Sequence, residues 1–219
     1  MSEFSYIRSW AAGLSRRAIL SLPFLLAAAS AARAAGPGVI GTVSRLAGSP
    51  SIQRPNGQSV PAARDMVVHE GDRVLTGTGG RLEVTGADGS IITVGEQTTV
   101  VLTRVLAPGD AGPGSGLLDL IEGILRLQLP GHWNRFEVIT ATAVASVRGT
   151  DWLIDAQGAA NTAVFVAQGS VEVENRARTG AVLLYPSFGT DVKAGALPTT
   201  PKVWAKKRVD AALARLAIP

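Results

Sequence analysis

Val147-Arg148-Gly149-Thr150-Asp151-Trp152 lies between two apolar runs, at residues 143–147 and 152–154. A glycine weakens the interior of a β-strand and often marks a bulge or the close approach of another backbone. An arginine is almost never fully buried unless it is paired. The stretch therefore predicts two strands separated by a bend. We expect the guanidinium of Arg148 to be mostly buried there, bonded to backbone carbonyls or to a carboxylate such as Asp151.

Short runs rich in Val, Ile, Leu and Thr recur from residue 39 to residue 193, bounded by Gly, Pro, Asn and Asp. Such runs are typical of β-strands. In Ser170-Val171-Glu172-Val173-Glu174 apolar side chains alternate with glutamates, which indicates a sheet with one solvated face. Asp88-Gly89 predicts a tight hairpin between two runs, because Gly89 can adopt a positive φ. The Gly/Pro-rich residues 107–116 predict an exposed loop.

Three segments share one pattern, in which an acid or amide and then a glycine precede an alternating run: Glu70-Gly71, Glu122-Gly123 and Gln168-Gly169. Glycine at the same phase of successive strands indicates matching turns stacked in register. We therefore expect an all-β fold. Its form would be a twisted β-sandwich or solenoid-like stack of short strands, with an N-terminal signal helix and one short C-terminal helix.

The C-terminal helix is predicted over residues 201–218, where Val209, Ala212 and Leu216 contribute to one apolar face and Pro201 suits the first turn. We expect it to pack on the β body and to cover a sheet edge. Its basic residues indicate contact with an acidic partner, contact with the β body, or a solvated face. The predicted organisation is an export signal at residues 1–34, a β-domain at 35–197, and a linker with a basic helix at 198–219.

The N-terminus has the pattern of an export signal. Arg16 and Arg17 precede an apolar run at residues 18–32, and Ala32 and Ala34 frame a small-x-small cleavage site. The run is shorter than the roughly 20 residues that a membrane span needs. We expect a twin-arginine signal cleaved after Ala34, and a periplasmic mature protein without a membrane segment. Two alternatives remain open, a general secretory signal and an uncleaved anchor.

Charge and composition exclude several classes of function. The chain has 21 basic and 17 acidic residues, but four arginines and one glutamate belong to residues 1–34. The remainder is nearly neutral and gives no indication of nucleic-acid binding. The absence of cysteine excludes disulfides, thiolate metal sites and cysteine nucleophiles. His69 and His132 fit no metal-ligand spacing, and no nucleophile–histidine pattern is evident. We expect no catalytic residues, no metal and no cofactor.

Trp133 and Trp152 have different expected roles. Trp152 lies inside an apolar run and is expected in the core. Trp133 follows Gly131-His132 in a turn-like stretch and is expected to be exposed. Beside His132 and Asn134, an exposed indole is able to stack on a sugar ring or a peptide side chain. These three residues form the candidate recognition site.

The pattern T-x-x-A-x-x-x-V-R-G-T-x-W, from Thr140 to Trp152, resembles the FecR-type periplasmic domain. The resemblance extends to Gly71-Asp72 and to the Asp88, Glu122 and Gln168 segments quoted above, and covers roughly residues 41–195. It implies the solenoid-like β-sandwich. It also implies a structural role for the motif residues Asp88, Gly89, Gly123, Val147, Arg148, Gly149, Thr150 and Gly169.

The sensor members of this family carry a cytoplasmic anti-sigma segment, one membrane helix, and a periplasmic sensing region that includes a C-terminal secretin/TonB-type subdomain. Here fifteen residues precede Arg16, and no βαβ-like segment follows Gly195. We therefore expect an exported, stand-alone, non-enzymatic domain that binds another envelope protein or a cell-wall glycan, with its oligomeric state left open. The alternative is a periplasmic regulator in a sigma-factor cell-surface signalling system, working through a separate membrane partner.

Overall fold

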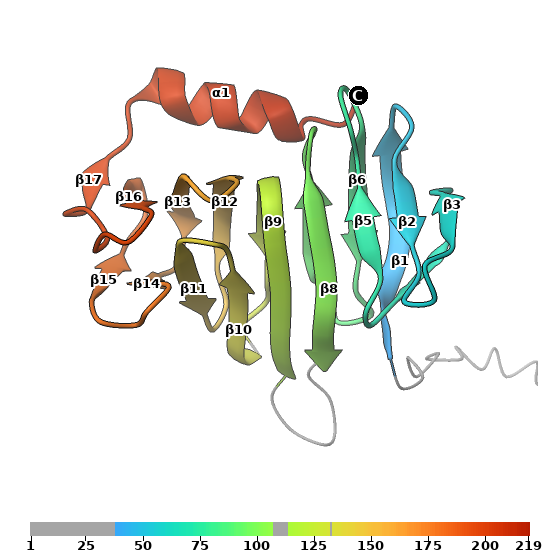
Figure 1. Cartoon of the computed structure of the whole chain (residues 1–219), viewed down its shortest axis with the longest axis horizontal. Helices are drawn as coiled ribbons and strands as arrows, with labels where there is room; N and C mark the ends of the chain where they lie inside the picture. Colours follow the sequence, from blue (N-terminus) through green and yellow to red (C-terminus); the bar gives the residue numbers. More distant parts are fainter. Residues whose placement is uncertain (1–37, 107–113, 132) are drawn as a thin grey trace, which may run out of the picture. The chain divides into compact units, whose positions relative to one another are not determined.

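The computed structural model describes residues 38–106, 114–131 and 133–219, and these residues form strands almost throughout (Figure 1). The predicted all-β fold with a short C-terminal helix is confirmed. The predicted signal helix lies outside the described residues. Strand pairing is antiparallel, except that β9 and β10 run parallel.

The strands form two sheets, here named sheet A and sheet B, which share β9. Sheet A has the order β4 (Val67–His69), β1 (Val39–Ala47), β6 (Arg81–Thr85), β7 (Ile91–Val94), β9 (Gly114–Gln128), β12 (Asp151–Gln157), β13 (Asn161–Gln168), β16 (Phe188–Lys193) and β17 (Lys202–Val203). Sheet B has the order β3 (Ser59–Pro61), β2 (Ser51–Gln53), β5 (Arg73–Leu75), β8 (Thr99–Leu106), β9, β10 (Trp133–Ile139), β11 (Ala143–Val147), β14 (Val171–Asn175) and β15 (Ala181–Leu184).

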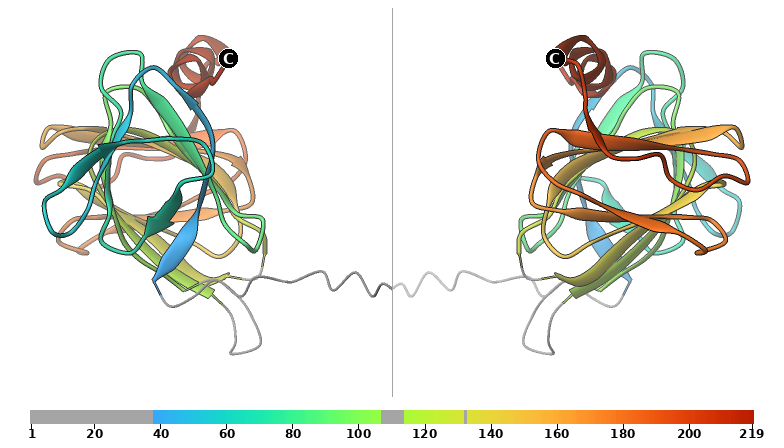
Figure 2. Two further views of the ribbon diagram at one scale, coloured as in Figure 1. Left: turned by 90° about the vertical axis from the view of Figure 1, so that its right-hand side faces the viewer. Right: turned by 90° about the vertical axis from the view of Figure 1, so that its left-hand side faces the viewer.

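The long strand β9 joins the two halves of the domain. Its first part pairs with β8 and β10 in sheet B, and its second part pairs with β7 and β12 in sheet A. Strands that precede β9 in the chain lie on one side of it, and strands that follow lie on the other (Figure 1). Viewed along the long axis, the chain passes back and forth between the two layers (Figure 2). This arrangement is the predicted solenoid-like sandwich.

The repeated glycines lie where the chain crosses from one sheet to the other. Gly71 separates β4 from β5, Gly123 lies at the bend of β9, and Gly169 separates β13 from β14. Their φ angles are +81°, +96° and +87°. Side-chain-bearing residues rarely adopt this region, whereas glycine enters it without a steric penalty. The shared pattern of these segments therefore has a common cause, which is a sharp turn between layers.

The core fills the space between the sheets. Its largest fully buried side chains include Trp152 and Phe136, together with inward-facing Leu and Ile residues of both sheets. Trp152 is 1% exposed, so its predicted core position is confirmed. Alternation along the strands produces the core. In β12, for example, Trp152 and Ile154 face inward while Leu153 faces outward.

The helix α1 spans Lys206–Leu216 and is shorter than predicted. Pro201 lies before it, and the intervening Lys202–Val203 pairs with β16 as β17. The helix covers a face of sheet A instead of a sheet edge (Figure 1). Ala212 and Leu216 form a second apolar cluster with outward-facing residues of β9, β12 and β13, namely Ile124, Leu153, Ala163 and Phe165, and with Trp204.

Two arginines of α1 bind carboxylates of the β body. Arg208 contacts Asp191 at 2.6 and 3.0 Å and lies 3.7 Å above the ring centroid of Trp204. Arg215 contacts Asp155 at 2.7 Å. Burial acts to raise the pKa of Asp191, but the hydrogen bonds from Arg208 hold that pKa below its ordinary value. Part of the basic charge of the tail therefore serves to dock the helix.

Candidate functional site

The Val147–Asp151 stretch forms the crossing from β11 in sheet B to β12 in sheet A. A Cβ on Gly149 would lie 2.6 Å from the Cα of Gly131, so only glycine fits this approach. Thr150 is buried and donates its hydroxyl hydrogen to the carbonyl oxygen of Ser170 at 3.0 Å. The amide of Leu129 donates to the carbonyl of Thr150 at 3.1 Å. These hydrogen bonds connect the crossing at Thr150 with the two crossings that contain Leu129 and Ser170.

Arg148 lies differently from the prediction. Arg148 is exposed. The carboxylate of Asp151 is bound by Arg126 instead, through contacts of 2.9 and 2.7 Å. This bidentate pair raises the pKa of Arg126 above its ordinary value, with burial opposing the shift. Asp151 begins β12 opposite Gln128 of β9, and its side chain contacts Arg126, two residues before Gln128 in the same strand. The prediction of a buried, anchored Arg148 is wrong, and its guanidinium is available to a ligand.

An open groove of about 520 Å³ surrounds Arg148 on the outer face of sheet B. We name it the Arg148 groove. Its lining residues are Asn134, Arg135, Ser146, Val147, Arg148, Gly149, Thr150, Ser170, Glu172 and Leu183. Hydroxyl, amide and charged groups dominate this lining, and Leu183 adds an apolar side chain at one border. The groove therefore offers hydrogen bonds and an arginine to a polar or charged partner.

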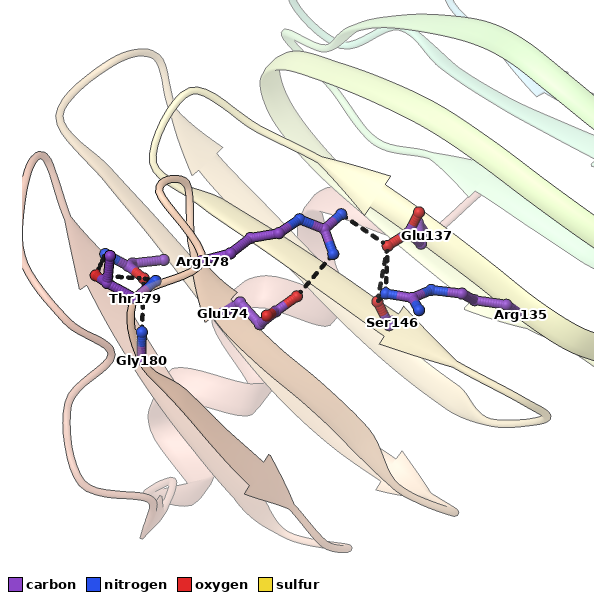
Figure 3. Close-up of polar contacts among 8 residues, drawn as sticks. Arg135, Glu137, Ser146, Glu174, Arg178, Thr179 and Gly180 are labelled. Carbon is purple, nitrogen blue, oxygen red and sulfur yellow. Dashed lines mark hydrogen bonds and ion pairs between the residues drawn. The ribbon is translucent and has the colours of Figure 1, made fainter.

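Beside the groove, a chain of ion pairs crosses β10, β11 and β14 (Figure 3). Glu137 accepts hydrogen bonds from Arg135 at 2.8 Å and from Arg178 at 3.0 Å. Arg178 also contacts Glu174 at 3.0 Å, and the hydroxyl of Ser146 donates to Glu137 at 3.2 Å. We name these five residues the Glu137 network.

The network holds Glu137 in its ionised form. Burial acts to raise the pKa of Glu137, but the hydrogen bonds from Arg178 and Arg135 bring that pKa below its ordinary value. Glu137 in turn raises the pKa of Arg178. Charges on this face are therefore fixed in place, which favours recognition of a partner with a matching charge pattern.

The turn between β14 and β15 positions Arg178 for this contact. The side-chain oxygen of Asn175 accepts hydrogen bonds from the amides of Thr179 at 2.9 Å and Gly180 at 3.1 Å (Figure 3). Arg178 itself has a φ of +54°, an unusual conformation for an arginine. The buried Asn175 therefore holds the turn in the shape that directs Arg178 toward Glu137.

The candidate recognition site around Trp133 is not formed as predicted. Trp133 is 3% exposed and packs edge-on against Phe136, with ring centroids 5.0 Å apart. His132 lies outside the described residues. Asn134 is exposed and lines the Arg148 groove. The prediction of an exposed Trp133 is wrong because this residue begins β10 and faces the core, where its indole is unable to stack on a ligand.

The remaining predicted residues occupy turns or fall outside the described part of the chain. Asp88 accepts hydrogen bonds from the amide and hydroxyl of Ser90 at 3.1 and 2.7 Å, and Gly89 has a φ of +82° in the hairpin between β6 and β7. The export-signal residues Arg16, Arg17, Ala32 and Ala34 lie outside the described residues. Among the described residues, no helix is long and apolar enough to cross a membrane. No cluster of three metal-ligating side chains occurs in that same part.

The Glu137 network was missed in the sequence. Its pattern was available, because Arg135 and Glu137 are two residues apart in one strand and Glu172 and Glu174 alternate in another. The sequence does not show that β11 pairs with both β10 and β14, which places the charged residues of these two strands on either side of β11.

One family model matches part of the chain. The family model described as FecR protein matches residues 72–172, which include every lining residue of the Arg148 groove except Leu183. Residues 72–172 are therefore similar to a FecR-type domain. No curated protein sequence matches significantly. The resemblance seen in the sequence is therefore confirmed at the level of the FecR domain.

Solved structures show a similar fold. Two crystal structures of a candidate anti-sigma factor from Parabacteroides distasonis, at 2.50 and 1.65 Å resolution, match with a TM-score of 0.52 and 22% sequence identity. Each match covers 64% of this chain, and it spans 63% and 64% of the respective crystallised chains. The β-domain described here thus shares its fold with part of that protein.

Proposed function

We propose that this protein is a non-catalytic regulator in an envelope signalling system of the sigma-factor type, and that it acts through a separate membrane protein. The FecR domain is the observation that carries the proposal. The fold shared with a candidate anti-sigma factor supports the regulatory reading over that of an unspecialised binding module. The export pattern at Arg16 and Arg17 favours a periplasmic location.

The Arg148 groove and the Glu137 network form the contact surface in this proposal. The surface offers an exposed arginine, fixed ion pairs and the apolar Leu183, a mixture typical of protein–protein contacts. Trp133, the residue expected to stack on a sugar ring, is buried and does not contribute to this surface. These features favour a protein partner over a cell-wall glycan.

The test compares the transcripts of a strain that lacks the gene for this chain with those of strains in which the gene is restored. The restored gene encodes the wild-type chain, Arg148→Glu or Arg73→Glu. Arg73 is an exposed arginine on β5, in the other half of sheet B, and serves as the matched control. Deletion should change a discrete set of transcripts that share one promoter class. Wild type and Arg73→Glu should restore them, whereas Arg148→Glu should not. If deletion changes no such set, the regulatory proposal fails. If Arg148→Glu restores it fully, the contact surface is wrongly placed.

A further inference from the structure

The two sheets have four edges among the described strands, and β15 differs from the other three. The edge strand β3 contains Pro61, β17 has only 2 residues and contains Lys202, and β4 has 3 residues. Short edges, proline and lysine protect a sheet against pairing with another chain. The 4 residues of β15 are Ala, Val, Leu and Leu, so this edge has neither a charge nor a proline.

The main chain of β15 presents unpaired groups at this edge. The amide of Asn175 donates to the carbonyl of Gly180 at 3.2 Å, and the register continues with Val173 opposite Val182. Hydrogen-bonded and non-hydrogen-bonded pairs alternate in an antiparallel ladder. Val182 therefore bonds to β14, whereas the N–H and C=O groups of Ala181 and Leu183 point away from β14. Strand β14 is the one pairing of β15 among the described residues.

Large apolar side chains accompany this free edge. Leu183 is 49% exposed, and Tyr185, which follows the strand on the same face, is 56% exposed. Leu197 is 58% exposed and lies beside Gly180, close enough to contact a Cβ at that position. Exposed apolar side chains beside a free edge are the combination that favours addition of another strand.

We propose that β15 pairs antiparallel with β15 of a second copy of this chain, around a two-fold axis at Val182. This register places Ala181 opposite Leu183 of the second copy, and Leu183 opposite the second copy's Ala181. Each of these pairings uses the outward main-chain groups and exchanges two hydrogen bonds. The small Ala181 leaves space for the large Leu183 across the axis. The edge is thus complementary to itself, which is the requirement for a closed two-fold contact.

The contact is short, so the dimer is weak. Pairing between 4-residue strands falls below the roughly 1,200 Å² of buried surface that stable protein–protein interfaces reach. Dimerisation should therefore depend on concentration and be lost on dilution. Because the contact is closed by its symmetry, the second copy uses up the free edge and no longer assembly follows.

A cysteine cross-link tests the register, because the chain contains no cysteine of its own. In the proposed dimer the two Val182 residues form a non-hydrogen-bonded pair, with Cα atoms about 4.5 Å apart, which falls within the range for disulfides. Val182→Cys in residues 34–219, the compact unit of the chain, should form a disulfide dimer under mild oxidation. The control is Ile121→Cys, because Ile121 is 51% exposed but lies in β9, which has strands on both sides.

Val182 is less exposed than Ile121, so random collisions would favour the control. We expect Val182→Cys to cross-link at least about tenfold faster than Ile121→Cys. The double variant Val182→Cys with Leu183→Lys should lose this advantage. Sedimentation of the cysteine-free protein should show dimers that increase with concentration, and Leu183→Lys should abolish them. Urea unfolding establishes that each variant is folded. Equal cross-linking rates at the two positions, or a monomer at every concentration tested, would overturn the proposal.

Discussion

Replacement of Gly123 by alanine tests the crossing of β9 between the sheets, on which the two-layer fold depends. Gly123 has a φ of +96°, and an added Cβ would lie 2.5 Å from the Cα of Thr98. Positive φ costs a side-chain-bearing residue roughly 1–2 kcal/mol. Overpacking against a neighbouring backbone costs roughly 1–3 kcal/mol more. We therefore expect Gly123→Ala to lower the free energy of unfolding by about 2–5 kcal/mol.

Gly89→Ala is the matched control. Gly89 also has a positive φ, +82°, but a Cβ there would meet no atom within 4 Å. This variant should lose only the conformational part, about 1–2 kcal/mol. Urea unfolding of residues 34–219, followed by the fluorescence of the buried tryptophans, measures both values. If Gly123→Ala is no less stable than Gly89→Ala, the close approach between β9 and Thr98 is refuted.

Three further predictions concern charge and export. Arg126→Ala should destabilise the domain by about 1–3 kcal/mol because it removes a bidentate, partly buried ion pair, whereas Arg148→Ala should stay within about 0.5 kcal/mol in the same urea assay. The pKa of Glu137 is lowered in the folded state, so its contribution to stability is present above the ordinary value of 4.5 and is lost as pH falls through the folded-state pKa. Glu137→Gln should therefore reduce the acid-induced loss of stability, and an unchanged pH profile would contradict this role. Replacing Arg16 and Arg17 by lysine should leave precursor in the cytoplasm, and normal processing in a pulse-chase experiment would exclude the twin-arginine route.

The backbone pattern was largely predictable from the sequence. Glycines such as Gly123 and Gly169 predicted the turns, because positive φ is a local requirement, and the structure shows that these turns join the two layers. Alternation in Val171 and Val173 correctly predicted which side chains face the core. The sequence was sufficient to predict these features because backbone conformation at glycine and side-chain alternation are each determined within a few residues.

Side chains whose position depends on strand pairing were not predictable. Trp133 looked exposed beside a turn, but it faces the core from the start of β10. Gly116 was expected in a loop, yet it lies in β9, where the absence of a Cβ leaves room for the ring of Phe136. Arg148 was expected to pair with Asp151, but the register of β9 and β12 supplies Arg126 instead. Each error arose from a neighbour that is distant in sequence.

Site-specific photocrosslinking in the native envelope tests whether the Arg148 groove contacts a membrane signalling partner. A photoreactive residue is placed at Arg148 or, as the control, at Arg73, and the adducts are identified by mass spectrometry. We expect one dominant membrane-protein adduct from position 148 that is absent from position 73. The same adducts from both positions, or none from position 148 in a strain with an intact transcript response, would contradict it.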